Sequence, residues 1–282
     1  MIWELGSRPL HFGDQVQIMG VLNATPDSFY DGGRYCEPRI AVERGLEMVE
    51  EGAAIVDIGG ESSRPPMYGA AEEVSVAEEC ARVLPVVEGL RRQSDVPISV
   101  DTVKAEVARR ALEVGADIIN DISALRHDPA MAEVAAQAGV PVVLMHRRGT
   151  AATMQQNTHY DDLPGTVYAF LQERVHAAQA QGVECVAVDP GLGFGKSPEG
   201  NLALLGMLER FLSLECPLVV GASRKSFIWK TLGLPVAKSL EGSLAAAVLA
   251  TEAGVHVLRV HDVAATLRAI RLVEAVRGQV PC

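Results

Sequence analysis

The chain has few aromatic residues, no basic excess and no cysteine pattern, and each absence excludes a class of protein. Phe, Trp and Tyr make up 5% of its 282 residues, and its five cysteines are widely spaced, with no CxxC pair. An odd number of scattered cysteines predicts free thiols in a reducing compartment rather than a disulfide framework. The formal net charge is −11, so the basic surface that duplex nucleic acid requires is absent.

Long apolar runs are also absent. The first residues, MIWELG, lack the basic start and apolar stretch of a signal peptide, and no run reaches the roughly 18 apolar residues of a membrane span. We therefore expect a cytoplasmic protein with no membrane or nucleic-acid partner. Because the protein is acidic, an anionic substrate would have to be held by a few well-placed basic residues.

The sequence does contain an alternation of short apolar runs with amphipathic stretches along nearly its whole length. This alternation predicts βαβ units and a parallel sheet. Helical stretches with glycine at or just after their ends cover residues 40–53, 103–114, 129–138, 166–181 and 240–253. The expected strands cover residues 16–22, 55–58, 98–100, 118–119, 140–145, 186–188, 218–220 and 257–260.

Eight strands joined by helices predict a (β/α)8, or TIM, barrel, a fold that typically needs about 250 residues. We expect a single domain over residues 1–282, in which residues 1–15 form a hairpin that closes the bottom of the barrel. Long loops are expected after strands 1, 2 and 5, and loops at that face are commonly lids or binding loops. They cover residues 23–38, 61–73 and 147–163.

Polar residues at the C-terminal ends of barrel strands are typical of catalytic and binding sites. Some of them fit the simpler interpretation that they cap the next helix, because helix N-caps are usually Ser, Thr, Asp or Asn. Lys225, Arg259 and His261 do not fit it, and they therefore predict a function. The residues that do fit it are Thr102, Asp121 and Asp262.

One group of strand ends predicts a ring-binding site. Asp101, Asn120 and Asp189 end the third, fourth and sixth strands and are expected to converge near the barrel axis. Two carboxylates and an amide suit a heterocycle with adjacent N–H groups, and a divalent cation is the alternative. No histidine joins them, which argues against zinc. Lys225 would neutralise the carboxylates or bond to a heteroatom of the ring.

A second group predicts a phosphate site. Arg259 and His261 lie two apart on the eighth strand, so they face the same side and suit a phosphate or pyrophosphate. Asn23 ends the neighbouring first strand, and its amide oxygen could hold Mg²⁺ on the same phosphates. The glycine-rich GLGFGKS, residues 191–197, matches neither a P-loop nor GxGxxG. Its glycines would instead let the backbone approach a flat ligand, with Phe194 as a wall.

Eight segments together resemble the dihydropteroate synthase family of folate biosynthesis, in order and over nearly the full length. The segments are GVLNATPDSFYDGG (20–33), DIGGESSRP (57–65), SVDT (99–102), INDI (119–122), LMH (144–146), DPGLGFGK (189–196), GASRKSF (221–227) and RVHDV (259–263).

The resemblance implies a transferase that condenses 6-hydroxymethyl-7,8-dihydropterin pyrophosphate with p-aminobenzoate, giving 7,8-dihydropteroate and pyrophosphate. It also implies a homodimer, a target of sulfonamides, and loss of pyrophosphate by dissociative C–O cleavage. By position, the implied pterin residues are Asp101, Asn120, Asp189 and Lys225. The implied pyrophosphate residues are Asn23, which also holds Mg²⁺, Arg259 and His261. The residues implied around p-aminobenzoate are Ser63, Arg64, Phe194, Gly221 and Ser223.

The sequence departs from the family pattern at Ser63, commonly Thr, at Pro66, commonly Gly, and after His146, where Arg-Arg-Gly replaces a Met-Gln-Gly type. These departures concern p-aminobenzoate and sulfonamide binding rather than the class of reaction. Two alternatives are a related methyltransferase that moves a methyl group from methyltetrahydrofolate to a corrinoid, and a non-catalytic relative that only binds pterin. His146 itself, at the end of the fifth strand, has no assigned role.

Overall fold

The computed structural model describes residues 1–5, 9–13, 15–25, 37–62, 74–150 and 153–278. An antiparallel hairpin of β1 (Ile2–Trp3) and β2 (Leu10–His11) precedes eight parallel strands. The parallel strands are β3 (Gln17–Asn23), β4 (Ile55–Gly59), β5 (Ile98–Asp101), β6 (Ile118–Asp121), β7 (Val142–Met145), β8 (Val186–Asp189), β9 (Val219–Val220) and β10 (Val257–Val260).

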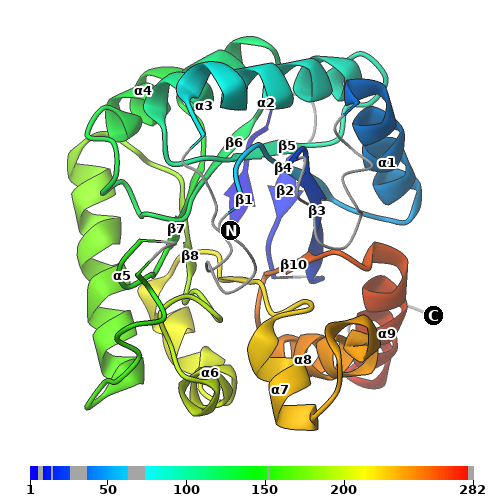
Figure 1. Cartoon of the computed structure of the whole chain (residues 1–282), viewed down its shortest axis with the longest axis vertical. Helices are drawn as coiled ribbons and strands as arrows, with labels where there is room; N and C mark the ends of the chain where they lie inside the picture. The colour runs from blue at the N-terminus through cyan, green and yellow to red at the C-terminus, as the bar shows by residue number, and fades with distance from the viewer. Residues whose placement is uncertain (6–8, 14, 26–36, 63–73, 151–152, 279–282) are drawn as a thin grey trace.

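The eight parallel strands form a nearly closed barrel. Their order is β8-β7-β6-β5-β4-β3-β10-β9, and a parallel bridge between Val188 and Leu218 brings the two ends of this sheet together. Figure 1 shows the helices arranged around the strands on the outside. The predicted (β/α)8 barrel is therefore confirmed. Much of the loops expected after the first two strands lies outside the described residues.

The connections carry more helices than the sequence pattern predicted. The unpredicted α2 begins at a capping box, in which Ser75 Oγ accepts from Glu78 N at 3.2 Å and the Glu78 carboxylate accepts from Ser75 N at 3.1 Å. In the described part of the chain, no helix is both long and apolar enough to cross a membrane. The helices are α1 (Pro38–Glu50), α2 (Val76–Arg91), α3 (Ala105–Glu113), α4 (Met131–Ala138), α5 (Leu163–Ala180), α6 (Pro198–Leu205), α7 (Ser226–Leu232), α8 (Leu240–Glu252), α9 (Val263–Val276) and the 3₁₀ segments η2 (Leu208–Leu214) and η3 (Val236–Lys238).

The N-terminal hairpin packs its side chains against one end of the barrel interior. Trp3 and Phe12 meet edge to face with ring centroids 5.0 Å apart, and Leu5 and Leu10 are buried with them. They share one apolar cluster with residues from seven strands. These residues are Met19, Ile55, Ile118, Val143, Ala187, Val219 and Val257.

The next layer of the interior follows from the two-residue period of a strand. Side chains two positions apart face the same way, so each residue two beyond this apolar layer also points into the barrel. In β5 the same step leads from Ser99 to Asp101. Over a rise of two residues the barrel interior therefore changes from apolar to largely polar. The residues two beyond the apolar cluster are Val21, Asp57, Asn120, Met145, Asp189, Gly221 and Arg259.

Candidate active site

One arginine joins three strands across the polar layer, and an asparagine links a fourth strand to them. Arg259 on β10 donates from Nε to Asp57 Oδ2 on β4 at 2.6 Å and from Nη2 to Asp101 Oδ2 on β5 at 2.6 Å. Asn120 on β6 donates from Nδ2 to the same Asp57 oxygen at 3.2 Å. Asp101 and Asn120 are also direct register partners. Two of the three residues expected to bind a ring, Asp101 and Asn120, therefore belong to one network around Arg259.

This network holds more negative charge than one guanidinium cancels. The Asp57 side chain is fully buried, and its Oδ1 has no hydrogen-bond donor among the described residues. Burial raises the pKa of Asp101 to about 7, although Arg259 opposes the shift. Burial alone would lower the pKa of Arg259, but Asp57 and Asp101 outweigh it and raise this pKa, so Arg259 stays charged. The layer is therefore rich in hydrogen-bond acceptors, as a ligand with several N–H groups requires.

Asp189, the third residue expected to bind the ring, lies near the ammonium group of Lys225. Asp189 Oδ1 accepts from Gly191 N at 2.7 Å, and burial raises the pKa of Asp189 against the opposing charge of Lys225. Lys225 Nζ donates to Leu192 O and lies 4.5 Å from the centre of the Phe194 ring. Burial lowers the pKa of Lys225 to about 8, while Asp189 acts to raise it. Asp189 and Lys225 therefore form the side of the site opposite Asp57.

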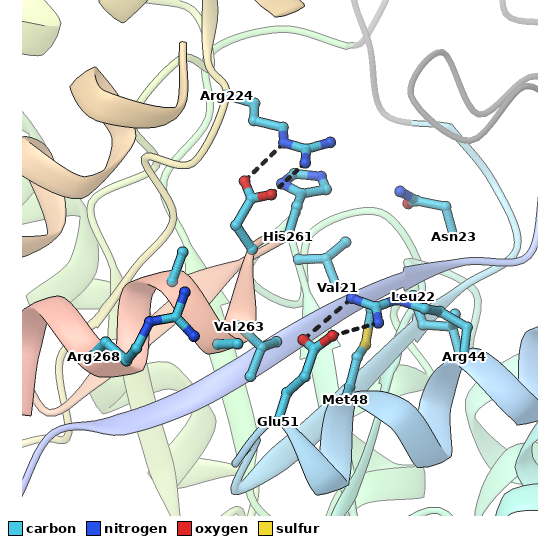
Figure 2. Close-up of a pocket in the computed structure, with 13 residues that line it drawn as sticks. Val21, Leu22, Asn23, Arg44, Met48, Glu51, Arg224, His261, Val263 and Arg268 are labelled. Carbon is cyan, nitrogen blue, oxygen red and sulfur yellow. Dashed lines mark hydrogen bonds and ion pairs between the residues drawn. The ribbon is translucent and has the colours of Figure 1, made fainter. Parts of the chain in front are cut away.

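An outer pocket of about 370 Å³ is lined by the ends of β3 and β10 and by the helices α1 and α9 that flank them. Figure 2 shows Asn23 across this pocket from His261, with Arg224 above them. The imidazole Nδ1 of His261 lies 3.1 Å from Ser223 Oγ. Arg224 Nε donates to Asp262 Oδ2 at 2.9 Å. This pocket contains the amide and the imidazole that the sequence assigned to pyrophosphate.

Arg259 does not line the outer pocket with His261, although the sequence placed both on one phosphate. Its Cα is level with Met19, four residues before Asn23 on β3, so its side chain starts deeper in the barrel. From there Asp57 and Asp101 bind Nε and Nη2. The remaining nitrogen, Nη1, has no hydrogen-bond partner among the described residues. Arg259 thus lies on the ring side of the site and retains donors for a further ligand.

The residues assigned to helix caps divide into two kinds. Asp121 accepts from the backbone N–H of Ser123 at 2.7 Å and of Leu125 at 2.9 Å, and Thr102 Oγ1 accepts from Lys104 N at 3.2 Å. Both therefore satisfy local backbone donors. For Asp262 the cap interpretation was wrong.

Asp262 makes no side-chain cap to α9 and instead pairs with Arg224. An ion pair with a half-buried guanidinium competes successfully with a backbone N–H for the same carboxylate. Arg224 is thereby held at the rim of the outer pocket.

The glycines of the 191–197 segment allow close packing within the protein. Gly191 has φ +68°, and a Cβ there would lie 1.9 Å from the carbonyl oxygen of His146. Gly193 has φ +87°, and its Cβ would lie 2.9 Å from Lys225 Cδ. The glycines were expected to let the backbone approach a flat ligand, but here they let it pack against the end of β7 and against Lys225. Phe194 is half-buried beside that lysine.

His146 is buried among aromatic side chains. Its ring is buried edge-on to Phe170, with centroids 4.9 Å apart, and 6.3 Å from Tyr160. Burial lowers its pKa to about 2, and its Nδ1 has no partner among the described residues. A neutral imidazole packed among aromatic rings acts as part of the core.

The described residues include no group of three or more His, Cys, Asp or Glu that could hold a metal ion. Ser63, Arg64 and Pro66, three residues of the expected p-aminobenzoate side, lie outside the described residues. Gly221 and Ser223 are buried at the end of β9, and a Cβ on Gly221 would lie 3.7 Å from Lys225 Nζ.

Sequence reasoning overlooked Asp57 as a site residue. The signal was available, because Asp57 interrupts the apolar run of β4 at the inward-facing position two before Gly59. A carboxylate that faces a barrel interior needs a buried cation, and Arg259 was the available one.

Comparison with known proteins agrees with this geometry. The family model described as "Pterin binding enzyme" matches residues 19–261. The dihydropteroate synthase of Escherichia coli strain K12 is 47% identical over 260 residues, which cover 92% of this chain and 90% of that protein.

Solved structures are similar over the whole chain. A Yersinia pestis dihydropteroate synthase with a sulfonamide drug complex superposes with a TM-score of 0.94 at 42% identity, covering 99% of this chain and 100% of that one. The Xanthomonas albilineans dihydropteroate synthase in complex with 7,8-dihydropteroate superposes with a TM-score of 0.87 at 42% identity, covering 100% of each chain.

Proposed function

The chain belongs to the pterin-binding enzyme family, among the dihydropteroate synthases, and from this premise we propose how its strand ends divide the reaction. The reaction joins 6-hydroxymethyl-7,8-dihydropterin pyrophosphate to p-aminobenzoate and releases 7,8-dihydropteroate and pyrophosphate. The observation that carries the proposal is the buried polar layer, in which Arg259 binds Asp57 and Asp101, Asn120 binds the same Asp57, and Asp189 lies by Lys225.

We propose that the polar layer binds the pterin ring. Asp101 and Asp189 offer carboxylate oxygens to ring N–H groups, and Asn120 offers both an amide donor and an acceptor. Asp57 holds Asn120 and Arg259 in place from below. Lys225 supplies a compact cation that bonds to a ring heteroatom and balances Asp189.

We propose that the outer pocket holds the pyrophosphate. His261 and Asn23 line it directly. Arg259 lies deeper, on the ring side, and its Nη1 would donate to a phosphate oxygen from there. The bond to the leaving oxygen breaks first, and the electron-rich pterin stabilises the cation that forms. The main contribution of the protein is then electrostatic stabilisation of the departing anion by fixed donors.

The donor set of the outer pocket fits Mg²⁺. This ion usually keeps several waters and binds through one or two protein oxygens together with substrate phosphates. Asn23, half-buried in the pocket, offers one such oxygen, and no closed set of protein ligands competes for the ion among the described residues. When bound, the ion would neutralise charge that develops on pyrophosphate.

We propose that p-aminobenzoate lies between Phe194 and the end of β9, where Gly221 and Ser223 are buried. Its neutral amine attacks the pterin methylene from this side. Ser63 and Arg64, carried over from the family pattern, would complete the pocket. This sequence departs from the family pattern at Ser63 and at other positions on this side of the site. We therefore expect its affinity for p-aminobenzoate to differ from that of other family members.

We also propose a homodimer that works in the cytoplasm. The outer surfaces of α8 and α9 expose Leu249 and Leu272, which are 56% and 68% exposed and offer apolar area to a second copy. The described cysteines, Cys80, Cys185 and Cys216, are free thiols, as in a reducing compartment.

Mixing the purified protein with both substrates and Mg²⁺ is expected to release one pyrophosphate for each dihydropteroate formed. Coupled detection of pyrophosphate together with chromatography of the pteroate product measures both. Reactions that lack p-aminobenzoate serve as the control and should give no pteroate. Heat of pterin binding by calorimetry without turnover would instead identify a binding protein, and methyl transfer to a corrinoid would identify the related methyltransferase.

A further inference from the structure

Lys196 is a buried lysine that, unlike Lys225, has no role in the reaction proposed above. Lys196 is 2% exposed, and its Nζ donates to three backbone carbonyl oxygens. The distances are 3.3 Å to His146 O, 2.7 Å to Gly191 O and 2.9 Å to Phe194 O. One ammonium group therefore links two carbonyls of the turn after β8, and it also links this turn to His146, which follows β7.

The site uses two kinds of anchoring. The ring residues sit on strands, whose hydrogen-bond ladder fixes them; Asp189, for example, accepts from His146 N at 2.9 Å and is in register with Met145. The turn of residues 190–196 lies beyond the ladder, so side chains must hold it. Besides Lys196, Asn201 Oδ1 accepts from Gly193 N at 2.6 Å, and Tyr160 donates to Gly195 O at 3.0 Å.

This turn carries the wall of the expected p-aminobenzoate pocket. The Phe194 carbonyl accepts from Lys196, and the Phe194 ring lies against the ammonium of Lys225. Movement of the turn would therefore displace the wall directly. The pterin carboxylates would move less, because they are held by the sheet.

The chemistry of the contact requires a lysine. Three converging carbonyls match the three N–H donors of a compact ammonium, whereas the planar fork of arginine diverges and methionine donates nothing. Burial acts to lower the pKa of Lys196 strongly, while Asp189 acts to raise it. The three carbonyls also favour the charged form, since a neutral amine has only two N–H groups to share among them.

We propose that Lys196 is a positioning residue, which holds Phe194 in place as the wall of the p-aminobenzoate pocket. This inference rests on the proposed function, because it assumes that Phe194 contacts that substrate. It differs from a general role in stability, because it predicts that one substrate is affected and the other is spared.

Substitution Lys196→Met should raise KM for p-aminobenzoate about tenfold, because three carbonyls lose their shared donor and the wall is released. KM for the pterin pyrophosphate should change by no more than about threefold, since its contacts are on strands. Steady-state kinetics with each substrate varied in turn measures the two values.

Asn201→Ala is the second variant, in case Lys196→Met does not fold. It releases the same turn from α6 and should raise KM for p-aminobenzoate in the same selective way. Lys230→Met, on the exposed side of α7, is the matched control and should match wild type. Thermal unfolding of each variant reports stability separately.

Equal changes in both KM values, or lowered thermal stability with both KM values unchanged in the folded variants, would overturn the positioning role. An inactive wild-type protein would instead overturn the proposed function, so the two failures are distinguishable.

Discussion

Replacing Arg259 with methionine should lower the free energy of unfolding by about 3–5 kcal/mol, the usual consequence of removing one partner from a buried ion pair. The reason is the fully buried Asp57 carboxylate, whose Oδ2 is held by Arg259 at 2.6 Å. Asp101 loses its cation in the same change. Synthesis of dihydropteroate should fall below detection, because the ring site and the donor for pyrophosphate are both lost.

Urea denaturation followed by circular dichroism measures the loss of stability. Arg224→Met is the matched control, since Arg224 pairs with the partly exposed carboxylate of Asp262 rather than with a fully buried one, and about 1 kcal/mol is expected there. The double variant Arg259→Met/Asp57→Asn should recover part of the loss, because it removes one of the two stranded charges. An unchanged unfolding free energy in Arg259→Met would show that the carboxylates do not depend on this cation.

Replacing Lys225 with methionine should reduce kcat/KM for the pterin pyrophosphate by roughly 10²–10³, the effect of losing one preorganised charge in a buried site. Lys225 is held between Leu192 O and the Phe194 ring, and it balances Asp189. A methionine of similar length keeps the packing but leaves that carboxylate without its cation.

The same variant should change the pH dependence. In the wild type, kcat/KM should rise with pH as Asp101 ionises around its pKa of about 7, because only the carboxylate accepts from ring N–H groups without donating. It should fall again as Lys225 loses its proton around its pKa of about 8. Lys225→Met should keep the rising limb and lose the falling one.

Lys225→Arg is the control for charge, because arginine stays protonated throughout the accessible range. Its profile should rise and then remain flat. A falling limb that persists near pH 8 in Lys225→Met would assign that limb to another group, and the role of Lys225 as the titrating cation would be wrong.

The alternation of short apolar runs with amphipathic stretches predicted the barrel, because each strand of a parallel sheet is marked by its own short apolar run. The inward direction of Asp101, Asn120 and Asp189 then follows from the two-residue period. The helix α2 was overlooked because its start signal, the Ser75–Glu78 capping box, follows directly on a segment read as loop.

Contacts between distant strands were less predictable. Arg259 and His261 share a face, yet the long Arg259 side chain is captured by Asp57, a residue 202 positions away in the sequence. The same limit applies to Arg224 and Asp262, because a short cap and a long ion pair compete for one carboxylate. Whether the cap or the ion pair forms depends on the strand register and on how deep each side chain lies in the barrel. A single sequence does not specify either.

The division of the strand ends is tested most directly by a crystal structure of the protein with bound pterin pyrophosphate. We expect one ring within hydrogen-bond distance of Asp101, Asn120 and Asp189, with its pyrophosphate in the outer pocket against Asn23 and His261. A ring bound in the outer pocket, or phosphates bound between Asn120 and Asp189, would contradict this division.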